Sequence, residues 1–447
     1  MALTSTDLAK KDIKDLLIKQ AVPASIGILF MTVNILIDTI FVGQWIGALA
    51  IAALTVIMPI TFFISSMGMA IGIGGGSVLS RALGSGNKEK ALSVFAHQIM
   101  MTFAIASLFV IFGLFFSDEI LFAFGANGAI MAPAKEFFFP ILLAVPFQAF
   151  CMMGNNVIRT EDKAKHAMIA MIISAVTNIL FDILFIKIFD WGIYGAALAT
   201  AVSFFLCFSY IFWFFLFKSE LKLKLNHFNY KGKIIAEITS LSFVTFARQG
   251  VISILALLIN HTLYSHGGEH AVTVYGIVSR MLMFALFPVL GITQGFLPIA
   301  GYNYGAGNYE RVRETITSAI KYASVLAIFI FIIILIFARP IVAVFTNDSQ
   351  VIADTPDVLR WVFAASPVIA VQLIGAAYFQ AAGKATKALL LTLTKQGFCL
   401  IPLVIILPGI FGLFGVWVAF PIADILSTAI TAYFLKREMQ NHLIPLK

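Results

Sequence analysis

The pentapeptide LGSGN at Leu83–Asn87 returns in altered form as YGAGN at Tyr304–Asn308, 221 residues further along the chain. One such match is weak evidence, because glycine and alanine are common in membrane helices. The same separation relates other residues in different parts of the chain, namely Pro146 to Pro367, Ile120 to Ile341, Ala167 to Ala388 and Ala50 to Ala271. The segment WGIYGA at 191–196 also matches FGLFGV at 411–416, at a separation of 220. The sequence therefore predicts two homologous halves.

Composition assigns both halves to a membrane. Of 447 residues, 60% are hydrophobic and 12% are charged, whereas soluble domains carry about 25% charged residues. The charges cluster between apolar stretches of about 20 residues, the length that spans a bilayer. Twelve such segments can be counted, at 17–43, 50–80, 91–116, 133–158, 166–189, 192–217, 237–265, 270–300, 313–337, 357–381, 387–408 and 412–435. We predict an all-α polytopic membrane protein with twelve transmembrane helices in two six-helix, pseudo-symmetric lobes.

The distribution of basic residues predicts the topology. Most of the 30 lysines and arginines fall in the termini and in alternate connections, while the opposite connections receive Lys135, Lys187, Arg339 and Arg360. This asymmetry places both termini in the cytoplasm and explains the net charge of +8 without nucleic acid. The expected divisions are an N-lobe at 1–217, a lysine-rich cytoplasmic linker at 218–236 and a C-lobe at 237–447. No cleaved signal peptide is expected.

Two parallel repeats suit a transporter that alternates access to a central site. A cation channel is a second interpretation, although no ring of pore-lining charges is evident. Enzyme signatures are lacking, and the glycine-rich Gly72–Ser77 has no phosphate-loop lysine. Cys151, Cys207 and Cys399 stand singly and are interpreted as packing residues. We expect no cofactor, so an ion gradient or the substrate's own gradient must drive any transport.

Acidic residues inside apolar segments are the strongest functional candidates, because each costs at least about 2.5–3.5 kcal/mol to insert. Asp38 follows Asn34 by four residues, and Asp182 follows Asn178 by four. Each pair therefore shares a helix face. With Thr200, these oxygens suit cation coupling, either to a proton shared by close carboxylates or to Na⁺ at the Asp38/Asp182 cluster. The alternative is that each acid is a buried structural residue bonded to its asparagine.

Other intramembrane residues are weaker candidates. Asp424 has Lys395 and Arg280 as candidate ion-pair partners in the C-lobe, and a structural pair is the favoured interpretation. Pro23 precedes Asp38 on the same predicted helix and is a candidate bend. Candidates for the lining of a substrate cavity are Met31, Gln148, Met152, Asn155, Asn156, Gln249, Asn260 and Gln372. Each polar member of this set also suits a helix–helix hydrogen bond.

These motifs, in this order, resemble the multidrug and toxic compound extrusion (MATE) transporters over almost the full chain. The resemblance rests on the following stretches: Pro23 with DTIFVG at 38–43, SRALGSGN at 80–87, NVIR at 156–159, Asn178 with Asp182, GIYGAALAT at 192–200, and QGFLPIAGYNYGA at 294–306. It implies twelve helices in two lobes forming a V, and export of cationic, amphipathic compounds by proton or sodium antiport.

Within the family, the resemblance implies DinF-type cation-site positions at Asp38, Asn178, Asp182 and Thr200, with Asn156 at or beside another polar position. The second half, at 395–402 and 417–424, resembles MepA-type exporters. The NorM-type branch has acids on the seventh and tenth helices, where this chain has Gln249, Asn260 and Gln372. A C-lobe sodium site is therefore not expected.

We accordingly predict a bacterial inner-membrane antiporter that exports cationic or amphipathic small molecules in exchange for H⁺ or Na⁺. We expect it to act as a monomer, with membrane lipid as its surroundings and no nucleic-acid partner. A flippase for lipid-linked precursors, from the same superfamily, is the alternative transporter. A basic cavity would favour that alternative, whereas the N-lobe here holds acids.

Overall fold

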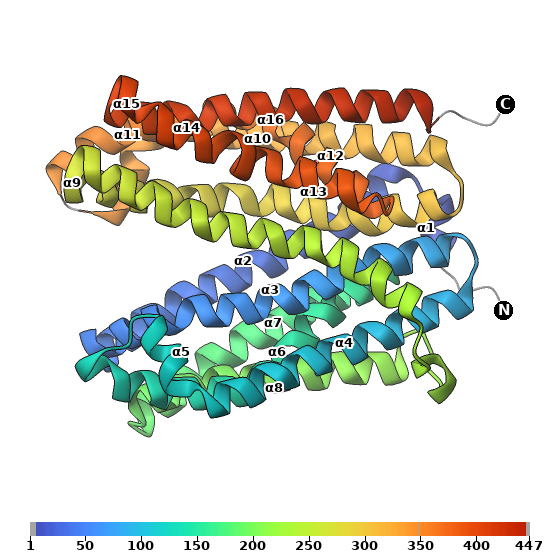
Figure 1. Ribbon diagram of the computed structural model, residues 1–447, viewed down its shortest axis with the longest axis horizontal. Coiled ribbons are helices and arrows are strands. Elements are labelled where there is room, and N and C mark those ends of the chain that lie inside the picture. The colour runs from blue at the N-terminus through green and yellow to red at the C-terminus, as the bar shows by residue number, and fades with distance from the viewer. Residues whose placement is uncertain (1–5, 347, 444–447) are drawn as a thin grey trace. The chain divides into compact units, whose positions relative to one another are not determined.

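The computed structural model describes residues 6–346 and 348–443, and every regular element within them is a helix (Figure 1). Eleven of the helices in this described part are long and apolar enough to cross a membrane. The first half contains α1 (Thr6–Lys10), α2 (Ile13–Trp45), α3 (Ala48–Gly84), α4 (Lys88–Phe115), α5 (Ser117–Ala123), η1 (Gly128–Ile130), α6 (Met131–Thr160), α7 (Ala164–Asp182), η2 (Ile183–Ile188) and α8 (Gly192–Phe217). The second half contains η3 (Leu225–Phe228), α9 (Gly232–Gly305), α10 (Tyr309–Phe345), α11 (Ser349–Phe363), η4 (Ser366–Val368), α12 (Ile369–Ala381), α13 (Ala385–Leu393), η5 (Thr394–Leu400), α14 (Ile401–Ile406), α15 (Pro408–Phe411) and α16 (Leu413–Asn441).

The 74-residue α9 contains two of the twelve predicted segments. Its backbone leaves helical geometry at Gly268, where φ is 61°. Residue 268 lies 221 positions after Gly47, which separates α2 from α3 with a φ of 120°. Glycine adopts positive φ at little steric cost, so both halves turn at the same place. The eleven spans thus correspond to twelve membrane-crossing segments, and the predicted fold class is confirmed.

Other turns repeat the same geometry. Gly86 and Gly307, which are 221 residues apart, have φ values of 72° and 71°. Immediately after each glycine, an asparagine side chain accepts a hydrogen bond from a backbone amide of the next helix, Asn87 from Lys90 and Asn308 from Arg311. The side-chain caps satisfy amides that the first helical turn leaves without a partner. The LGSGN and YGAGN motifs are therefore one helix–turn–helix connection used twice.

The helices form two compact units that exchange their first segments. Unit 1 is built from Ile26–Thr245, and unit 2 from Leu8–Ser25 together with the chain from Phe246 onwards. The beginning of α2 thus belongs to unit 2, and the beginning of α9 to unit 1. The predicted N-lobe at 1–217, linker at 218–236 and C-lobe at 237–447 remain a prediction.

Close glycine contacts explain how the exchanged segments are held. In unit 1, Gly74 of α3 lies against the backbone of Ser242 near the start of α9. In unit 2, Gly295 lies against Ala21 of α2, and a Cβ on Gly295 would come within 2.8 Å of the Ala21 backbone nitrogen. Both residues of the first contact are 221 positions from those of the second. Each half therefore uses the same small residue to admit the other half's first helix.

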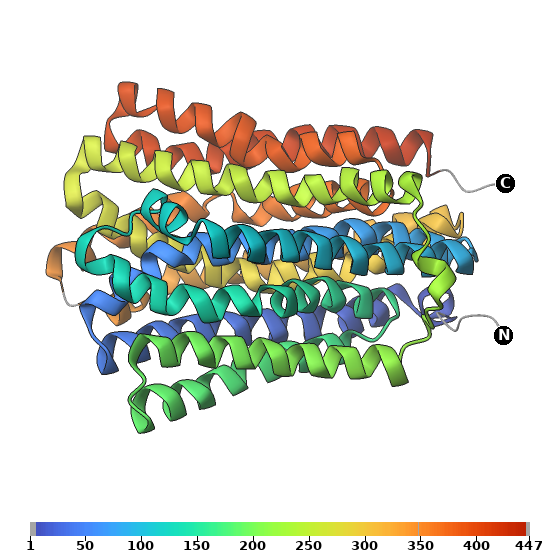
Figure 2. The same ribbon diagram turned by 60° about the horizontal axis from the view of Figure 1, so that its bottom comes forward.

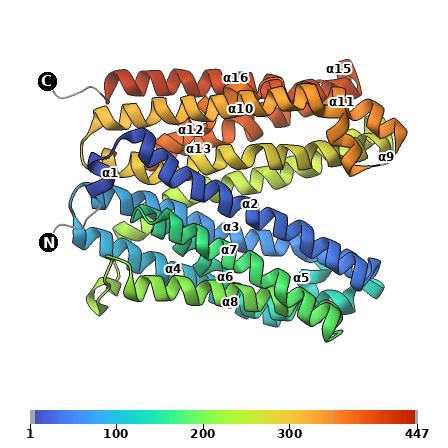
Figure 3. The same cartoon turned by 180° about the vertical axis from the view of Figure 1, so that it is seen from behind.

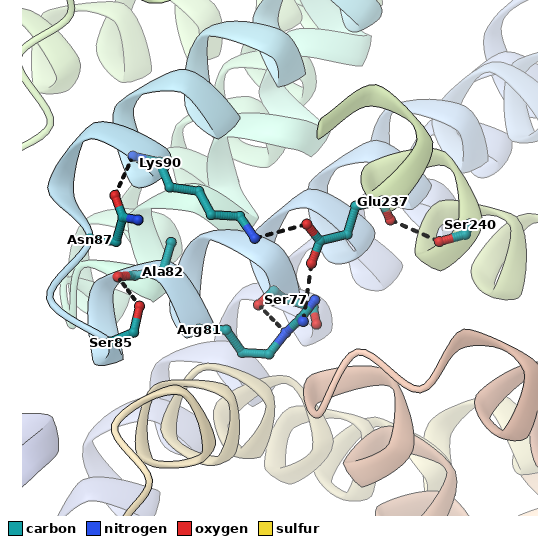
Figure 4. Close-up of polar contacts among 8 residues, drawn as sticks. All are labelled: Ser77, Arg81, Ala82, Ser85, Asn87, Lys90, Glu237 and Ser240. Atoms are coloured by element: carbon teal, nitrogen blue, oxygen red, sulfur yellow. Dashed lines mark hydrogen bonds and ion pairs between the residues drawn. The ribbon is translucent and has the colours of Figure 1, made fainter. Parts of the chain in front are cut away.

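Ion pairs add to this contact in unit 1. Glu237, in the second turn of α9, accepts from Arg81 at 3.1 Å and from Lys90 at 2.9 Å (Figure 4). The connection after α8 leads directly into this segment, as Figure 2 shows in yellow-green. There the Lys231 ammonium donates to Ser93 Oγ at 2.7 Å. In unit 2, Arg311 instead donates to the backbone oxygen of Lys11, at 2.6 Å.

One helix is central to the packing of each unit. In unit 1, α6 packs against α3, α4, α7 and α8, and its inward face supplies buried residues such as Phe137, Ile141 and Val145. In unit 2, α12 packs against α10, α13 and α16. Tyr378 and Phe379 of α12 are almost completely buried. The outer helices keep many exposed apolar side chains, as expected for surfaces that face lipid.

Candidate functional site

The predicted polar residues of the first half gather on three helices of unit 1. Asn34 and Asp38 lie one turn apart on α2, Asn178 and Asp182 lie one turn apart on α7, and Thr200 lies on α8. Figure 3 shows α2 beside α7. Asn178 and Asp182 are 4% and 0% exposed, and the other three residues are partly buried. The structure thus brings together all five residues that were selected for cation coupling.

An amide chain joins the three helices. Asn34 Nδ2 donates to Asn178 Oδ1 at 2.7 Å, and also to the Ala175 carbonyl at 3.4 Å. Asn178 Nδ2 in turn donates to Thr200 Oγ1 at 3.3 Å, and Thr200 donates to the carbonyl of Ala196. Each amide is therefore oriented by a neighbour. These hydrogen bonds hold the facing surfaces of α2 and α7 together, one helical turn away from the two acids.

The carboxyl groups of Asp38 and Asp182 lie close enough to interact with each other. None of the described residues donates a hydrogen bond to either oxygen of Asp182, or to Oδ1 of Asp38. Two ionised carboxylates can only accept, so the pair has no donor when both are charged. A proton shared between them, or a cation bound by both, would satisfy the pair. This unsatisfied buried acid pair is the main chemical feature of the site.

The backbone widens directly after Asp182. Residues Ile183–Ile188 form the π-helical segment η2, and π-helical turns often occur at functional sites. Gly195 of α8 packs against the carbonyl of Phe185 within this segment, where an added Cβ would lie 3.0 Å from the oxygen. Lys187, also in η2, lies over the ring of Trp45 at 5.4 Å. The end of α7 is therefore held by α8 and by the end of α2.

Unit 2 contains a separate buried ion pair, on the helices that correspond to α7 and α8. Lys395 lies in the π-helical segment η5, and its Nζ is 2.7 Å from Asp424 Oδ1 on α16. Asp424 is 5% exposed. Arg280, the other predicted partner, is exposed on α9. The acid of unit 2 thus has a cation beside it, whereas the two acids of unit 1 have each other.

The remaining predicted residues occupy varied positions. Gln148 donates to Ser65 Oγ at 2.5 Å, which ties α6 to α3. Asn155 donates to the Ala167 carbonyl at 2.7 Å, which ties α6 to α7, and it accepts from Arg159. Asn156 donates to the Met152 carbonyl, and Gln372 donates to the Leu391 carbonyl. Met31, Met152 and Gln249 are partly buried, whereas Asn260 is exposed. Pro23 lies within the continuous helix α2.

Several polar partners were not selected from sequence. Ser65 is one, because a hydroxyl in an apolar helix usually bonds to its own backbone. Glu237 and Glu438 are others, since they fall near helix ends where charges are expected. Glu438 is 2% exposed and pairs with Lys384 and Lys387. The π-helical segments have no simple sequence signal, although each lies beside an intramembrane charge.

Comparisons with known proteins follow the same pattern. Residues 23–184 and 245–406 each match the MatE family model, one match for each half. The chain is 24% identical over 420 residues to the multidrug export protein MepA of Staphylococcus saprophyticus, covering 93% of this chain and 92% of that protein. It is 25% identical over 422 residues to the protein of the same name from Staphylococcus aureus, with the same coverage. A solved structure described as the outward-facing conformation of a multidrug resistance MATE family transporter matches with a TM-score of 0.93 at 25% identity, over 98% of both chains.

Proposed function

Because this chain belongs to the MATE family of membrane transporters, we propose that it exports cationic, amphipathic compounds in exchange for protons, with Asp38 as the principal coupling carboxylate. The observation that carries the proposal is the proximity of the Asp38 and Asp182 carboxyl groups, in which both oxygens of Asp182 and Oδ1 of Asp38 lack a donor from the described residues. An intramembrane acid is a functional candidate by default. The names of the staphylococcal relatives support multidrug compounds as the substrates.

The coupling requires only that proton and substrate compete. When the acid pair of unit 1 is ionised, its negative charge attracts a cationic substrate into the lobe. Arrival of a proton neutralises one carboxyl, which then donates to the other. The substrate loses its counter-charge and is released, while the proton leaves on the opposite side. Asn34, Asn178 and Thr200 keep α2 and α7 aligned during this exchange through their hydrogen bonds.

The choice of proton over sodium rests on the available oxygens. Hard cations bind several oxygen ligands. Among the described residues no third His, Cys, Asp or Glu joins the two acids in a metal-binding group. The side-chain oxygen of Asn178 already accepts from Asn34. Two carboxyls that interact directly, with no third acid from the described residues beside them, are suited to sharing a proton.

The proposal also includes orientation. Both termini and the lysine-rich connection at 218–233 are assigned to the cytoplasm of a bacterial cell, because basic connections remain on that side. Pro23 is assigned as a bending point of α2, since proline removes one helical hydrogen bond. Bending there would link the charge state of Asp38 to the position of the exchanged segment Leu8–Ser25.

The test is substrate efflux from proteoliposomes under two separate gradients. We expect an imposed pH gradient without a sodium gradient to drive ethidium transport, and a sodium gradient without a pH gradient to be ineffective. Asp38→Asn should abolish the pH-driven transport, whereas Asp118→Asn, in an exposed Lys135 pair, should not. Transport driven by the sodium gradient alone would show that the coupling ion is sodium and not the proton. Substrate flux with no exchange of either ion would reject antiport altogether.

A further inference from the structure

An apolar cavity of about 330 Å³ lies in unit 1, away from the acid pair, between α4, α6, α8 and the connection that follows α8. Its lining includes seven phenylalanines, several aliphatic side chains and one charged residue, Lys222. Small-molecule sites commonly enclose about 300–1,000 Å³ and combine apolar walls with a few polar groups. The size and composition of the cavity are therefore those of a site for one apolar chain.

The walls are a connected set of aromatic rings. The ring of Phe150 on α6 lies 5.0 Å from that of Phe208 and 6.2 Å from that of Phe215, both on α8. Phe215 also contacts Phe95 of α4 at 4.7 Å. These rings thus pack against one another around the space. The packed rings therefore leave a defined apolar space that has room for one apolar chain.

The cavity opens on the outer surface of α8. Two lining residues, Phe212 and Leu216, are 47% and 51% exposed. They lie on a helix that is long and apolar enough to cross a membrane. An apolar occupant can therefore enter from the surrounding lipid. Water has little reason to fill the space, since apolar cavities stay dry.

Lys222 supplies the polar group at the rim. Its Nζ donates to the Leu216 carbonyl at 2.7 Å, which fixes the ammonium group beside an exposed lining residue. An ammonium group has three N–H donors, so two remain for another acceptor. Lys218 and Lys224 are also exposed on the same short stretch, 218–224, in which Glu220 is the one acidic residue. The rim is therefore positively charged.

We propose that this cavity binds one acyl chain of an anionic phospholipid, whose phosphate is held by Lys222. The apolar walls suit the chain, and the basic rim suits a negative headgroup at the membrane surface. The end of α8 is expected to lie at the depth of the lipid headgroups. There Trp213 lies under the Lys218 ammonium at 5.9 Å, and such residues concentrate at the membrane interface. A free anion would leave the apolar space empty, and a zwitterionic lipid would place its own positive charge beside the ammonium groups of the rim.

Native mass spectrometry of the purified full chain tests the headgroup. We expect more bound phosphatidylglycerol than phosphatidylcholine when both are supplied with the same acyl chains. Lys222→Gln should reduce phosphatidylglycerol binding by roughly fivefold, the effect of one basic residue near an anionic surface. Lys436→Gln removes the same charge from an exposed position on α16 and should leave binding unchanged. Equal effects of the two substitutions, or equal binding of the two lipids, would overturn the proposal.

A second variant tests whether the acyl chain of the lipid occupies the cavity. Ile99→Trp adds volume inside the cavity and should displace the bound lipid while the thermal unfolding temperature stays within a few degrees of the wild type. Should that variant unfold, competition still decides the matter, because inorganic phosphate alone should not displace phosphatidylglycerol. Full displacement by phosphate would identify a simple anion site and reject the acyl chain.

Discussion

Asp38 of α2 and Asp182 of α7 face each other through their carboxyl groups, and none of the described residues donates a hydrogen bond to either oxygen of Asp182. Two carboxylates in this arrangement behave as one proton-binding group. Substitution of either acid should therefore affect the same step, although not in the same way. The two variants can distinguish the group that carries the proton from the group that supports it.

Asp182→Asn is expected to leave substrate binding intact and to abolish proton-coupled efflux. The new amide would donate to Asp38 and hold that carboxylate in its charged form, which favours a bound cation. The measurement is ethidium binding and efflux as a function of pH. A variant that still releases ethidium on acidification would contradict the shared-proton mechanism. Asp190→Asn, an acid in the nearby turn after η2, is the control.

Asn178→Ala should destabilise unit 1 by about 1–3 kcal/mol, because Asn34 then loses its buried acceptor. The matched control is Thr177→Ala on the same helix, since Thr177 donates to carbonyls of its own helix, those of Ile173 and Ser174. Thermal unfolding in detergent measures the difference. If both variants unfold at the same temperature, the amide chain does not contribute to stability.

Glu237→Gln should weaken the attachment of the α9 start within unit 1. The carboxylate pairs with Arg81 and Lys90 at side-chain exposures of 19–39%, so we expect a loss of about 1 kcal/mol, which high salt should reduce. Ser240→Ala, one turn later, is the control, because Ser240 donates only to a backbone oxygen (Figure 4). A stability difference that persists unchanged at high salt would exclude an electrostatic origin.

Glu161 should make the stability of the protein depend on pH. This side chain is buried in the turn between α6 and α7, and burial raises its pKa from 4.5 to about 7, despite hydrogen bonds from Ser219 and the Glu220 amide. Between pH 4.5 and about 7, the Glu161 carboxyl therefore keeps its proton in the folded state but has lost it in the unfolded state. The free energy of unfolding should therefore fall by at most about 3 kcal/mol as pH rises from about 4.5 to about 7, and it should stay level at higher pH.

The check on Glu161 is the unfolding temperature measured across this pH range. Glu161→Gln keeps the hydrogen-bonding shape without a titrating group, so it should remove that part of the slope. Glu119→Gln, at an exposed position in α5, should keep it. An unchanged slope in Glu161→Gln would assign the pH dependence to other groups.

Gly295→Ala should disturb the packing of α2 within unit 2. The new methyl group would lie 2.8 Å from the backbone nitrogen of Ala21 and 3.0 Å from the Cβ of Gln20, so the helix must shift. We expect destabilisation of about 1–3 kcal/mol. Gly276→Ala in the same helix meets no heavy atom within 4 Å and should be neutral or slightly stabilising. Equal unfolding temperatures for the two variants would show that the contact is not tight.

The sequence by itself determined the features that depend on spacing along one helix or along the chain. Apolar length predicted the membrane-crossing segments, and the four-residue spacing of Asn34 from Asp38, and of Asn178 from Asp182, placed each pair on one helix face. The separation of 221 residues identified the two halves, because homologous turns need glycine at the same positions. Periodicity and steric permission are local properties, and the sequence expresses them directly.

Only the tertiary structure decided which faces meet. The contact of Asp38 with Asp182, the pairing of Asp424 with Lys395 in place of Arg280, and the exchange of the first segments of α2 and α9 all join residues far apart in the chain. The cavity beside Lys222 likewise depends on how rings from three helices pack. Many side chains have suitable chemistry for such contacts, and close packing in three dimensions selects among them.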